Sequence, residues 1–379
     1  MKIMYLSATA GGTLKYINML YEKLKNEDIE FVGVFSENHK EMCEKDLPDM
    51  RKIYLNMKAK RNVFENISLI IKLKEIFKKE SPDILYINGG RISFVSRLAA
   101  RSFKNIRIVF NPHGWNFNKP FIPFLERVFA KNITDVIIND SKKEENLAKK
   151  YNINPKLAMA QINTGIDFTK YDDLNDENKK QEIRKKIREE LKVDEFQKII
   201  VQLGNINEKR DPFLMLNIGL AIIKMGYNIK LIMIGDGEPE YIKKIMEFAE
   251  ENNILDKIEI TGWVDDVSEY LISSDIALST VRDENTPIIL AEYMAAKLPI
   301  ITNNSEINAE ILDYGKFGKI AENGDVEDYI SKIQEVFIEF NKNKTFAESA
   351  YRYAKENYNI NNMVKKHMEI FKILFEERN

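Results

Sequence analysis

The sequence is poor in the residues that cross-link a chain or hold a metal ion. Its 379 residues include one cysteine, Cys43, and three histidines, His39, His113 and His367. This composition excludes a disulfide-rich scaffold, a zinc ribbon and most multi-histidine metal centres, and it fits the reducing cytosol. No run approaches the roughly 18 consecutive apolar residues of a membrane span, and the N-terminal residues do not resemble a signal peptide. We therefore expect a cytoplasmic protein.

Charge of neither sign dominates the whole chain, but its two halves differ. Residues 1–170 contain 29 Lys and Arg against 19 Asp and Glu, a net charge of +10, whereas residues 171–379 contain 28 against 40, a net charge of −12. Most of the positive excess lies in residues 51–131, with 17 basic and 5 acidic side chains. Such a field attracts phosphates, anionic lipid or nucleic acid. The aromatic residues are not interleaved with the basic ones as a base-stacking platform requires, so we expect no nucleic acid partner.

Short apolar runs of strand length alternate with longer stretches of helical periodicity. This order predicts parallel sheets that are covered by helices on both faces. Because 379 residues exceed a typical domain of about 150, we predict an α/β protein with two doubly wound sheets. The predicted strands are residues 2–7, 31–35, 84–88, 106–111 and 136–139 in a first series, and residues 199–203, 229–234, 258–261, 276–280 and 299–302 in a second.

A polar stretch over residues 171–195 separates the two series and shows a helix signal but no strand signal. We place the boundary near residue 170, which predicts an N-terminal domain over residues 1–170 and a C-terminal domain over residues 171–360. Residues 361–379 carry apolar side chains at helical spacing, so this final helix must dock on another element. Ligands of doubly wound sheets bind at the carboxyl ends of the strands. We therefore expect the functional residues in the loops that follow the strands.

Glycines follow two predicted strands where a helix then begins. Gly11 and Gly12 follow the first strand and leave helix N-terminal N–H groups open to an anion or a hydroxyl. Gly235 and Gly237 follow the strand over residues 229–234 in the same way. Either pair could instead form an ordinary tight turn, and the dinucleotide fingerprint G-x-G-x-x-G is absent.

Two glutamates eight residues apart flank the start of another predicted helix. Pro287 suits the first helical turn and Thr286 can serve as the N-cap, so Glu284 lies in the preceding loop and Glu292 in the second turn. Both carboxylates could then face a ligand whose phosphate lies at the helix N-terminus. By composition alone, two solvated glutamates would be the simpler interpretation.

The segment from Glu284 to Pro299 resembles the E-x7-E segment of retaining, nucleotide-sugar-dependent glycosyltransferases of the GT-B fold, family 4. The usual form of that segment is E-G-x-P followed by E-A-M-A-x-G-x-P, and the spacing, Pro287 and Met294 agree with it. Weaker matches follow in the family's order along nearly the whole chain. They are Gly11 and Gly12, residues 111–114, Ser141, residues 163–167, Gly204 with Lys209 and Arg210, residues 235–237 and residues 262–264.

The resemblance implies two Rossmann-like domains that face each other across a cleft. The N-terminal domain would bind the acceptor and the C-terminal domain the nucleotide-sugar donor. The last helix would pack back on the N-terminal domain. The sequence departs from the family pattern at Asn205, where an arginine is usual, at Asn285 and Lys297, where glycines are usual, and at Tyr293, where alanine is usual.

The resemblance also implies a role for each matched residue. Charge develops on the leaving β-phosphate when the sugar–nucleotide bond breaks, so a preorganised cation belongs beside it. Lys209 and Arg210 match the family's phosphate-binding cation. Glu284 would bind sugar hydroxyls, Glu292 the ribose hydroxyls, and His113 the donor sugar near the reacting centre.

These roles define the predicted site. The predicted catalytic residues are His113, Glu284 and Lys209. The predicted donor-binding residues are Gly11, Gly12, Gly204, Asn205, Lys209, Arg210, Gly235, Trp263, Val264, Asn285, Thr286, Pro287, Ile288 and Glu292. We predict neither a metal ion nor a cofactor, because no D-x-D motif follows a predicted strand and the phosphate charge can be met by cations and helix dipoles. In the retaining members of the family the departing phosphate takes the acceptor proton, so no enzymic base is obligatory.

The expected activity is transfer of a hexose or N-acetylhexosamine from a nucleotide-sugar to a glycan or lipid-linked saccharide in surface polysaccharide or glycoconjugate biosynthesis. A UDP-sugar is the expected donor, ahead of GDP-mannose. Lys58, Lys60 and Arg61, with apolar residues 121–125, could form a face that meets anionic lipid on the inner side of the cytoplasmic membrane. An ordinary core helix flanked by solvated lysines explains the same pattern.

Two other classes use the same fold. A nucleotide-sugar 2-epimerase needs several acid/base groups around the sugar, and the sequence offers few. A non-catalytic partner subunit would have lost Glu284, Lys209 or His113, and all three are present.

Overall fold

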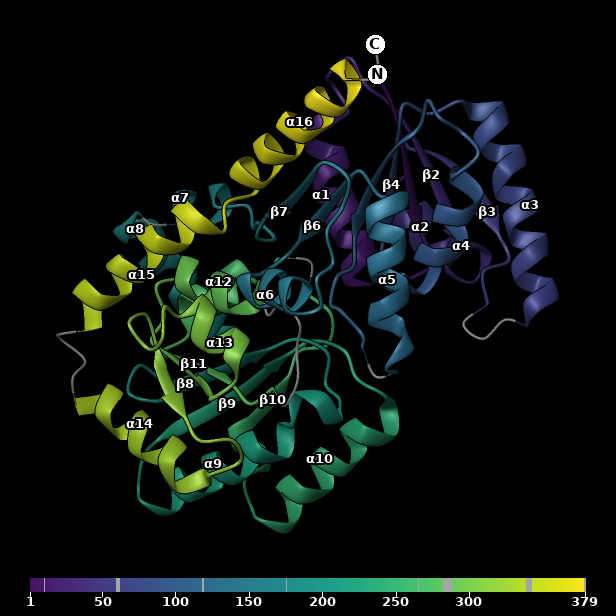
Figure 1. Cartoon of the computed structure of the whole chain (residues 1–379). Coiled ribbons are helices and arrows are strands. Elements are labelled where there is room, and N and C mark those ends of the chain that lie inside the picture. The colour runs from purple at the N-terminus through teal and green to yellow at the C-terminus, as the bar shows by residue number, and fades with distance from the viewer. Residues whose placement is uncertain are drawn as a thin grey trace. The chain divides into compact units, whose positions relative to one another are not determined.

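The chain forms two compact units, each built on a parallel sheet with helices on both faces (Figure 1). The computed structural model describes residues 1–9, 11–58, 62–117, 119–174, 176–264, 266–281, 288–338 and 343–377. Unit 1 comprises Met1–Gly165 together with Ile360–Asn379, and unit 2 comprises Ile166–Asn359. The predicted α/β class with two doubly wound sheets is thereby confirmed. The chain passes from one unit to the other after Gly165, a few residues before the boundary that we expected near residue 170.

The sheet of unit 1 has seven strands in the order β3-β2-β1-β4-β5-β6-β7, and neighbouring strands are parallel. The strands are β1 (Lys2–Ser7), β2 (Glu30–Ser36), β3 (Arg51–Leu55), β4 (Ile84–Asn88), β5 (Arg107–Asn111), β6 (Val136–Asn139) and β7 (Ala158–Gln161). The two edge strands, β3 and β7, are absent from the sequence prediction. Both are only partly buried, so they do not need the continuous apolar runs that mark strands inside a sheet.

Helices cover the two faces of this sheet. One face packs against α1 (Gly12–Leu24), α2 (Lys40–Asp46) and α16 (Ile360–Glu376). The other packs against α3 (Val63–Glu80), α4 (Gly90–Ala100), α5 (Phe121–Asn132) and α6 (Lys142–Lys150). The final helix, α16 (Figure 1, yellow), buries Met363, Phe371 and Leu374 in the core that it shares with α1 and the sheet. This burial satisfies the apolar face of the helix, so the last segment of the chain completes unit 1.

The sheet of unit 2 has six strands in the order β10-β9-β8-β11-β12-β13, again parallel. The strands are β8 (Lys198–Leu203), β9 (Ile229–Ile234), β10 (Ile258–Ile260), β11 (Ile276–Ser279), β12 (Ile300–Asn303) and β13 (Lys319–Ala321). The helices are α7 (Thr169–Asp173), α8 (Glu177–Glu190), α9 (Pro212–Lys224), α10 (Pro239–Glu251), α11 (Ser268–Ser273), α12 (Ile288–Ala295), α13 (Glu306–Ile311), α14 (Val326–Ile338) and α15 (Asn343–Asn357). The three-residue edge strand β13 is also absent from the sequence prediction. It is too short to produce a hydrophobic pattern.

Three inner strands, β4, β6 and β11, are each preceded by an aspartate. The carboxylate of each aspartate accepts a hydrogen bond from a backbone amide of the neighbouring strand. Asp83 Oδ2 accepts a hydrogen bond from the Lys2 amide at 2.7 Å, and Asp135 Oδ2 accepts one from the Ile108 amide at 2.7 Å. In unit 2, Asp275 Oδ2 accepts a hydrogen bond from the Ile199 amide of β8 at 2.9 Å. These carboxylates satisfy N–H groups at the amino edges of the sheets, where the ladder begins. They stabilise the edge opposite to the one where ligands of such sheets bind.

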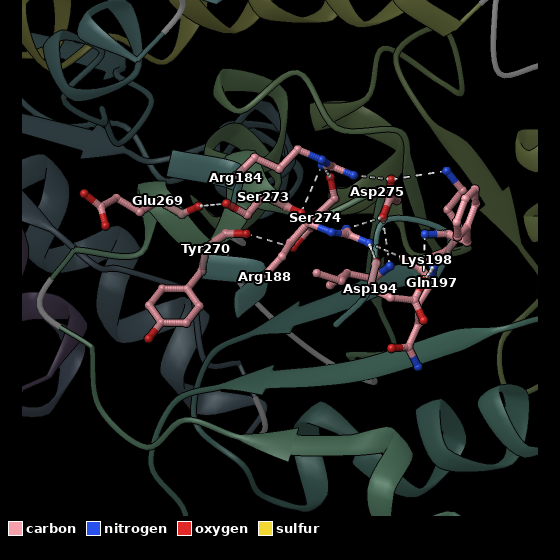
Figure 2. Close-up of polar contacts among 12 residues, drawn as sticks. Arg184, Arg188, Asp194, Gln197, Lys198, Glu269, Tyr270, Ser273, Ser274 and Asp275 are labelled. Atoms are coloured by element: carbon pink, nitrogen blue, oxygen red, sulfur yellow. Dashed lines mark hydrogen bonds and ion pairs between the residues drawn. The ribbon is translucent and has the colours of Figure 1, made fainter. Parts of the chain in front are cut away.

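Asp275 is the centre of the largest of these polar clusters (Figure 2). Its Oδ1 lies 2.7 Å from Arg184 Nη2, and its Oδ2 accepts from the Ile199 amide at 2.9 Å and lies 3.4 Å from Arg188 Nη1. Arg184 Nη1 also donates to the carbonyl oxygens of Ser273 and Ser274, at 3.0 and 3.1 Å. The highly polar helix α8 is therefore attached to α11 and to the start of β8 by its arginines.

Candidate active site

Buried polar side chains end the four central strands of unit 1. Ser7, Asn88, Asn111 and Asn139 close β1, β4, β5 and β6 and are at most 1% exposed. Ser7 pairs with Asn88 in the sheet register, and Asn88 pairs with Asn111. Buried polar groups are as a rule hydrogen-bonded, and Asn139 Oδ1 accepts from Trp115 Nε1 in the loop after β5 at 2.9 Å. This carboxyl edge is therefore built to orient the loops that follow it.

His113 lies in the loop after β5 and is held from three strand ends. Its backbone has φ +49° and its amide donates to Asn111 Oδ1 at 3.1 Å. Its Nδ1 lies 2.7 Å from Asp140 Oδ2, and its Nε2 lies 3.2 Å from Asn88 Oδ1. The Asn88 amide nitrogen donates to the Tyr86 carbonyl at 3.3 Å, which turns the amide oxygen toward His113. Both partners of the imidazole are then acceptors, so a ring that carries both protons can donate to both.

A second histidine, His367 of α16, is fully buried and contacts Tyr16, a neighbour of His113. His367 Nδ1 lies 2.7 Å from the Met363 carbonyl oxygen, which can only accept, so Nδ1 carries the proton. Its Nε2 is then the acceptor nitrogen, and it lies 2.9 Å from the Tyr16 hydroxyl oxygen and 3.0 Å from the Tyr86 hydroxyl oxygen. Burial lowers the pKa of His367 to about 4, so the ring is neutral near pH 7. Tyr16 in turn packs edge-on against His113, with 4.8 Å between ring centroids, so α16 contributes to the position of the site histidine.

Gly11 and Gly12 lie at the same edge of unit 1 as His113. Gly11 has φ +70° and precedes α1, and a Cβ on either glycine would meet nothing within 4 Å. Thr9 and Thr13, on either side of this pair, line a cavity of about 640 Å³ that His113 also lines. The structure therefore brings the three predicted residues of unit 1 together.

In unit 2, backbone hydrogen bonds join the loops after β8, β9 and β10. The Gly204 amide donates to the Ile234 carbonyl at 2.9 Å, and the Ile206 amide donates to the Asp236 carbonyl at 2.7 Å. Asp236 Oδ1 also accepts from the Trp263 amide at 2.9 Å. A Cβ on Gly235, which has φ +145°, would lie 2.3 Å from the Gly204 carbonyl oxygen. Only glycine therefore fits at position 235. The hydrogen bonds place the three loops side by side, and these loops carry the predicted residues Gly204, Asn205, Gly235, Trp263 and Val264.

The predicted phosphate-binding cations lie on a short 3-10 turn, Glu208–Arg210. A Cβ on Gly204 would meet Arg210 Cζ at 2.9 Å, so the guanidinium lies directly against that glycine. The Arg210 carbonyl oxygen accepts from Thr280 Oγ1 at 2.6 Å and from Gln202 Nε2 at 3.0 Å, whereas the Lys209 side chain is exposed. Arg210 thus supplies a cation next to Gly204 although Asn205 replaces the arginine usual in the family.

Helix α12 carries the second glutamate and contacts the end of β8. Ile288 and Glu292 are half-buried on it, whereas Tyr293 is fully buried and its hydroxyl oxygen accepts from the Leu203 amide at 2.7 Å. The tyrosine that departs from the family pattern therefore supports the strand end that leads into Gly204. Of the other predicted residues, Glu284, Asn285, Thr286 and Pro287 lie outside the described residues.

Lys297, which stands where the family usually has a glycine, has a backbone conformation that favours glycine. Its backbone has φ +57°, the left-handed region that favours glycine. Its Nζ lies 2.7 Å from Glu348 Oε2 and 4.7 Å from the centre of the Tyr351 ring. The ion pair and the ring contact hold the Lys297 side chain at the turn after α12.

The partners of His113, Asp140 and Asn88, are functional candidates that the sequence analysis missed. Asp140 is 3% exposed and also accepts from Asn111 Nδ2 at 2.9 Å. Both residues end or follow predicted strands, which was a signal available in the sequence. Within the described ranges, no group of three or more His, Cys, Asp or Glu side chains is arranged to hold a metal ion. None of the helices described there is long and apolar enough to cross a membrane.

Two doubly wound parallel sheets with glycine-rich loops at their carboxyl edges define a GT-B type of protein, and comparison with known families agrees. The family model for glycosyl transferases group 1 matches residues 183–353, and the model for glycosyltransferase family 4 matches residues 10–170. The chain belongs to the group 1 glycosyltransferases of the family 4 type. The resemblance seen in the sequence is confirmed, and glycosyl transfer in glycoconjugate biosynthesis is the activity that the family supports.

Curated relatives resemble most of the chain at low identity. The UDP-Gal:alpha-D-GlcNAc-diphosphoundecaprenol alpha-1,3-galactosyltransferase of Escherichia coli is 24% identical over 286 residues, which cover 72% of each chain. The capsular polysaccharide biosynthesis glycosyltransferase CapM of Staphylococcus aureus is 25% identical over 368 residues, which cover 94% of this chain and 93% of CapM.

Solved structures show the same fold. A glycosyltransferase from Rickettsia africae superposes with a TM-score of 0.85 at 20% identity, and the match covers 98% of each chain. Anabaena HepE in complex with UDP has a TM-score of 0.82 at 14% identity, covering 98% of this chain and all of HepE. The predicted GT-B fold is thereby confirmed.

Proposed function

We propose that the protein is a retaining, metal-independent glycosyltransferase that moves a hexose or N-acetylhexosamine from a UDP-sugar to a glycan or lipid-linked saccharide. The name of the Escherichia coli relative gives UDP-Gal as donor and a diphosphoundecaprenol-linked sugar as acceptor, and HepE was crystallised with UDP and with UDP-glucose. The CapM relative acts in capsular polysaccharide biosynthesis. These relatives favour a UDP donor over GDP-mannose.

The observation that carries the proposal is the contact between α12 and the end of β8. The hydrogen bond from the Leu203 amide to the Tyr293 hydroxyl brings the helix that carries Glu292 to the strand that leads into Gly204. Arg210 lies against Gly204 in the same unit. A nucleotide bound at these loops has a carboxylate for its ribose hydroxyls and a guanidinium for its diphosphate.

Each residue then has a defined task in the reaction. Arg210 and Lys209 stabilise the charge that develops on the leaving phosphate, a role for which a fixed cation is more effective than water. Glu292 accepts from the ribose and sets donor affinity. His113, oriented by Asp140 and Asn88, contacts the donor sugar. The departing phosphate removes the acceptor proton, so neither an enzymic base nor a metal ion is required.

The donor site is tested by thermal unfolding with UDP, GDP, their sugar conjugates and NAD, in EDTA throughout. A ligand at about 100 times its dissociation constant adds roughly 2.7 kcal/mol of stability. UDP and one UDP-sugar should raise the midpoint, and Glu292→Ala should weaken that shift. Glu247→Ala, which removes an exposed glutamate of α10, is the matched control and should keep it. A shift with GDP instead of UDP, or an unchanged shift in Glu292→Ala, would contradict the proposal.

Product analysis tests the reaction. NMR of the purified product should show the same anomeric configuration as the donor sugar, and turnover should persist in EDTA. Conversion of the UDP-sugar to its 2-epimer without an acceptor would instead identify the epimerase alternative.

We also propose that unit 1 associates peripherally with an anionic membrane. Helix α3 exposes Phe64, Ile67 and Ile71 on one side, at 82%, 49% and 53%, and Phe121 and Phe124 of α5 are exposed at 54% and 58%. Exposed apolar side chains next to lysines suit a lipid interface. Flotation with anionic liposomes should carry the protein upward, and Phe64→Ser/Ile67→Ser should reduce this. Protein that remains entirely in the soluble fraction would count against the proposal.

A further inference from the structure

Asn111, the last residue of β5, places its whole side-chain amide against the surroundings of His113. It is fully buried. Its Oδ1 accepts from the His113 amide at 3.1 Å, and its Nδ2 donates to Asp140 Oδ1 at 2.9 Å and to the Tyr16 hydroxyl oxygen at 3.4 Å. An amide side chain offers one acceptor oxygen and two donor hydrogens. The oxygen and both hydrogens of Asn111 therefore have partners.

A backbone group fixes the direction of this amide. The His113 N–H can only donate, so the Asn111 atom that faces it is the oxygen, and Nδ2 is left to face Asp140. His113 also has φ +49°, a left-handed conformation that costs free energy for a residue with a Cβ. Such a conformation persists where the surrounding contacts determine it. The Asn111 oxygen is one of these contacts.

The same amide determines how Asp140 meets the imidazole. Because Asp140 Oδ1 takes a hydrogen of Asn111, Oδ2 is the oxygen that faces His113 Nδ1, at a distance of 2.7 Å. A carboxylate only accepts hydrogen bonds, so Nδ1 carries a proton. Nε2 is then the ring nitrogen left for a further partner, and Asn88 Oδ1 lies 3.2 Å from it.

We propose that Asn111 and Asp140 are positioning residues that decide which ring nitrogen of His113 carries the proton, and thereby what Nε2 presents to the donor sugar. Asn111 acts through Asp140, and neither side chain needs to touch the substrate. The contacts run from a backbone N–H, whose direction is fixed by the loop, to Nδ1, so the ring is oriented before the donor binds. The assignment rests on the proposed function only for the task of His113, because contact with the donor sugar belongs to that proposal.

An isosteric variant should reverse the arrangement. In Asp140→Asn the new amide must turn its oxygen toward Asn111 Nδ2, because that atom still donates. The new NH₂ group then faces His113 Nδ1, which has to accept, and the ring proton moves to Nε2. In the double variant Asn111→Ala/Asp140→Asn the fixed donor is gone. The new amide can then turn its oxygen to the ring, and Nδ1 should regain its proton in part.

The positions of the ring protons are measured by ¹⁵N NMR of protein labelled at histidine. The chain has three histidines, and the variants His39→Gln and His367→Gln assign their signals. At about pH 8, Nδ1 of His113 should be protonated in the parent and unprotonated in Asp140→Asn. An unprotonated Nδ1 in the parent would overturn the proposal without any variant, and so would a protonated Nδ1 in Asp140→Asn.

Asp135→Asn is the matched control for lost stability. Asp135 is 1% exposed and accepts from the Ile108 amide at the amino edge of the same sheet. This variant removes a buried carboxylate far from the loop of His113. It should lower the melting temperature and leave Nδ1 of His113 protonated.

Kinetics test the consequence for the reaction. Asp140→Asn should lower kcat with a UDP-sugar about tenfold or more, the scale of one hydrogen bond to a charged group, and change the donor KM by no more than about twofold. Asp135→Asn should keep kcat. An unchanged kcat in a variant whose ring proton has moved would overturn the influence of Nε2 on the reaction.

The donor site is checked on the same proteins. The UDP-dependent rise in melting temperature should persist in Asp140→Asn, because the nucleotide binds the loops of unit 2. Absence of this rise in the parent would count against the proposed donor site, whereas the NMR result does not depend on a donor.

Discussion

The burial of His367 makes a specific prediction about pH and stability. Desolvation lowers the pKa of this side chain in unit 1 to about 4, whereas the unfolded chain has a value near 6.5. The hydrogen bond to the Met363 carbonyl and the charge of Asp140 oppose the shift, and His113 adds to it. Between these two pKa values the unfolded state binds the proton and the folded state does not. The stability that His367 contributes is therefore complete above about pH 6.5 and is lost as the pH falls toward 4.

The magnitude follows from the two pKa values. At pH 5 the unfolded chain carries the proton almost fully and the folded chain hardly at all. The free energy of unfolding of unit 1 should then be about 2 kcal/mol lower than at pH 7. The carboxylates whose pKa is lowered in the fold, such as Glu80 and Asp172, lose their contribution below their own ordinary pKa. The difference between the parent and a variant without this ring, from pH 7 to 5, therefore reports on His367.

The assay is urea unfolding at pH 5, 6 and 7, followed by Trp115 fluorescence in a Trp263→Phe background, which removes the other tryptophan, so that unit 1 is observed separately. His367→Gln has no titrating ring at this position. It should be less stable than the parent at pH 7, because the packing with Tyr16 and Tyr86 changes, but its decline from pH 7 to 5 should be smaller by about 2 kcal/mol. His39→Gln, at a half-buried position in a short 3-10 turn, should keep the full decline. An equal decline in His367→Gln and the parent would refute the reasoning.

Three further substitutions and one control, Gly226→Ala, test the architecture of unit 2. Tyr293→Phe leaves the buried Leu203 amide without an acceptor, and it should lower stability by about 1–3 kcal/mol and weaken UDP binding, as measured by melting with and without UDP. Gly235→Ala would place a Cβ 2.3 Å from a carbonyl oxygen of the β8 loop, so UDP binding should be lost. Gly226→Ala, also at positive φ but with nothing within 4 Å, should cost about 1 kcal/mol and keep UDP binding. Asp275→Asn should destabilise unit 2 by about 3 kcal/mol in urea unfolding, because it removes the charge that two arginines of α8 share. An unchanged midpoint would show that the cluster in Figure 2 is solvated rather than structural.

The inner strands of both sheets were readable from the sequence because a strand covered on both faces must be apolar along its length. Three of the four edge strands were not: β3 and β7 are only partly buried, and β13 has three residues. The fourth edge strand, β10, was predicted. The same rule located the loops that follow the strands, and with them Gly11, Gly12 and Gly235. The pair Glu284 and Glu292 was visible as a pattern, but the roles of Glu284, Gly204 and His113 were reached by family resemblance, and these roles stay predictions.

Only the tertiary structure showed what surrounds these residues. Asn88 and Asp140 contact His113 because sheet register brings together strand ends that lie more than twenty residues apart in the chain. Arg97 and Glu126 come from two different helices, and no local pattern predicts that their side chains meet. Sequence periodicity records which face of an element is buried, because burial constrains each element by itself. The pairing of particular polar side chains depends on how the elements pack, and it was decided only when the sheet and its helices assembled.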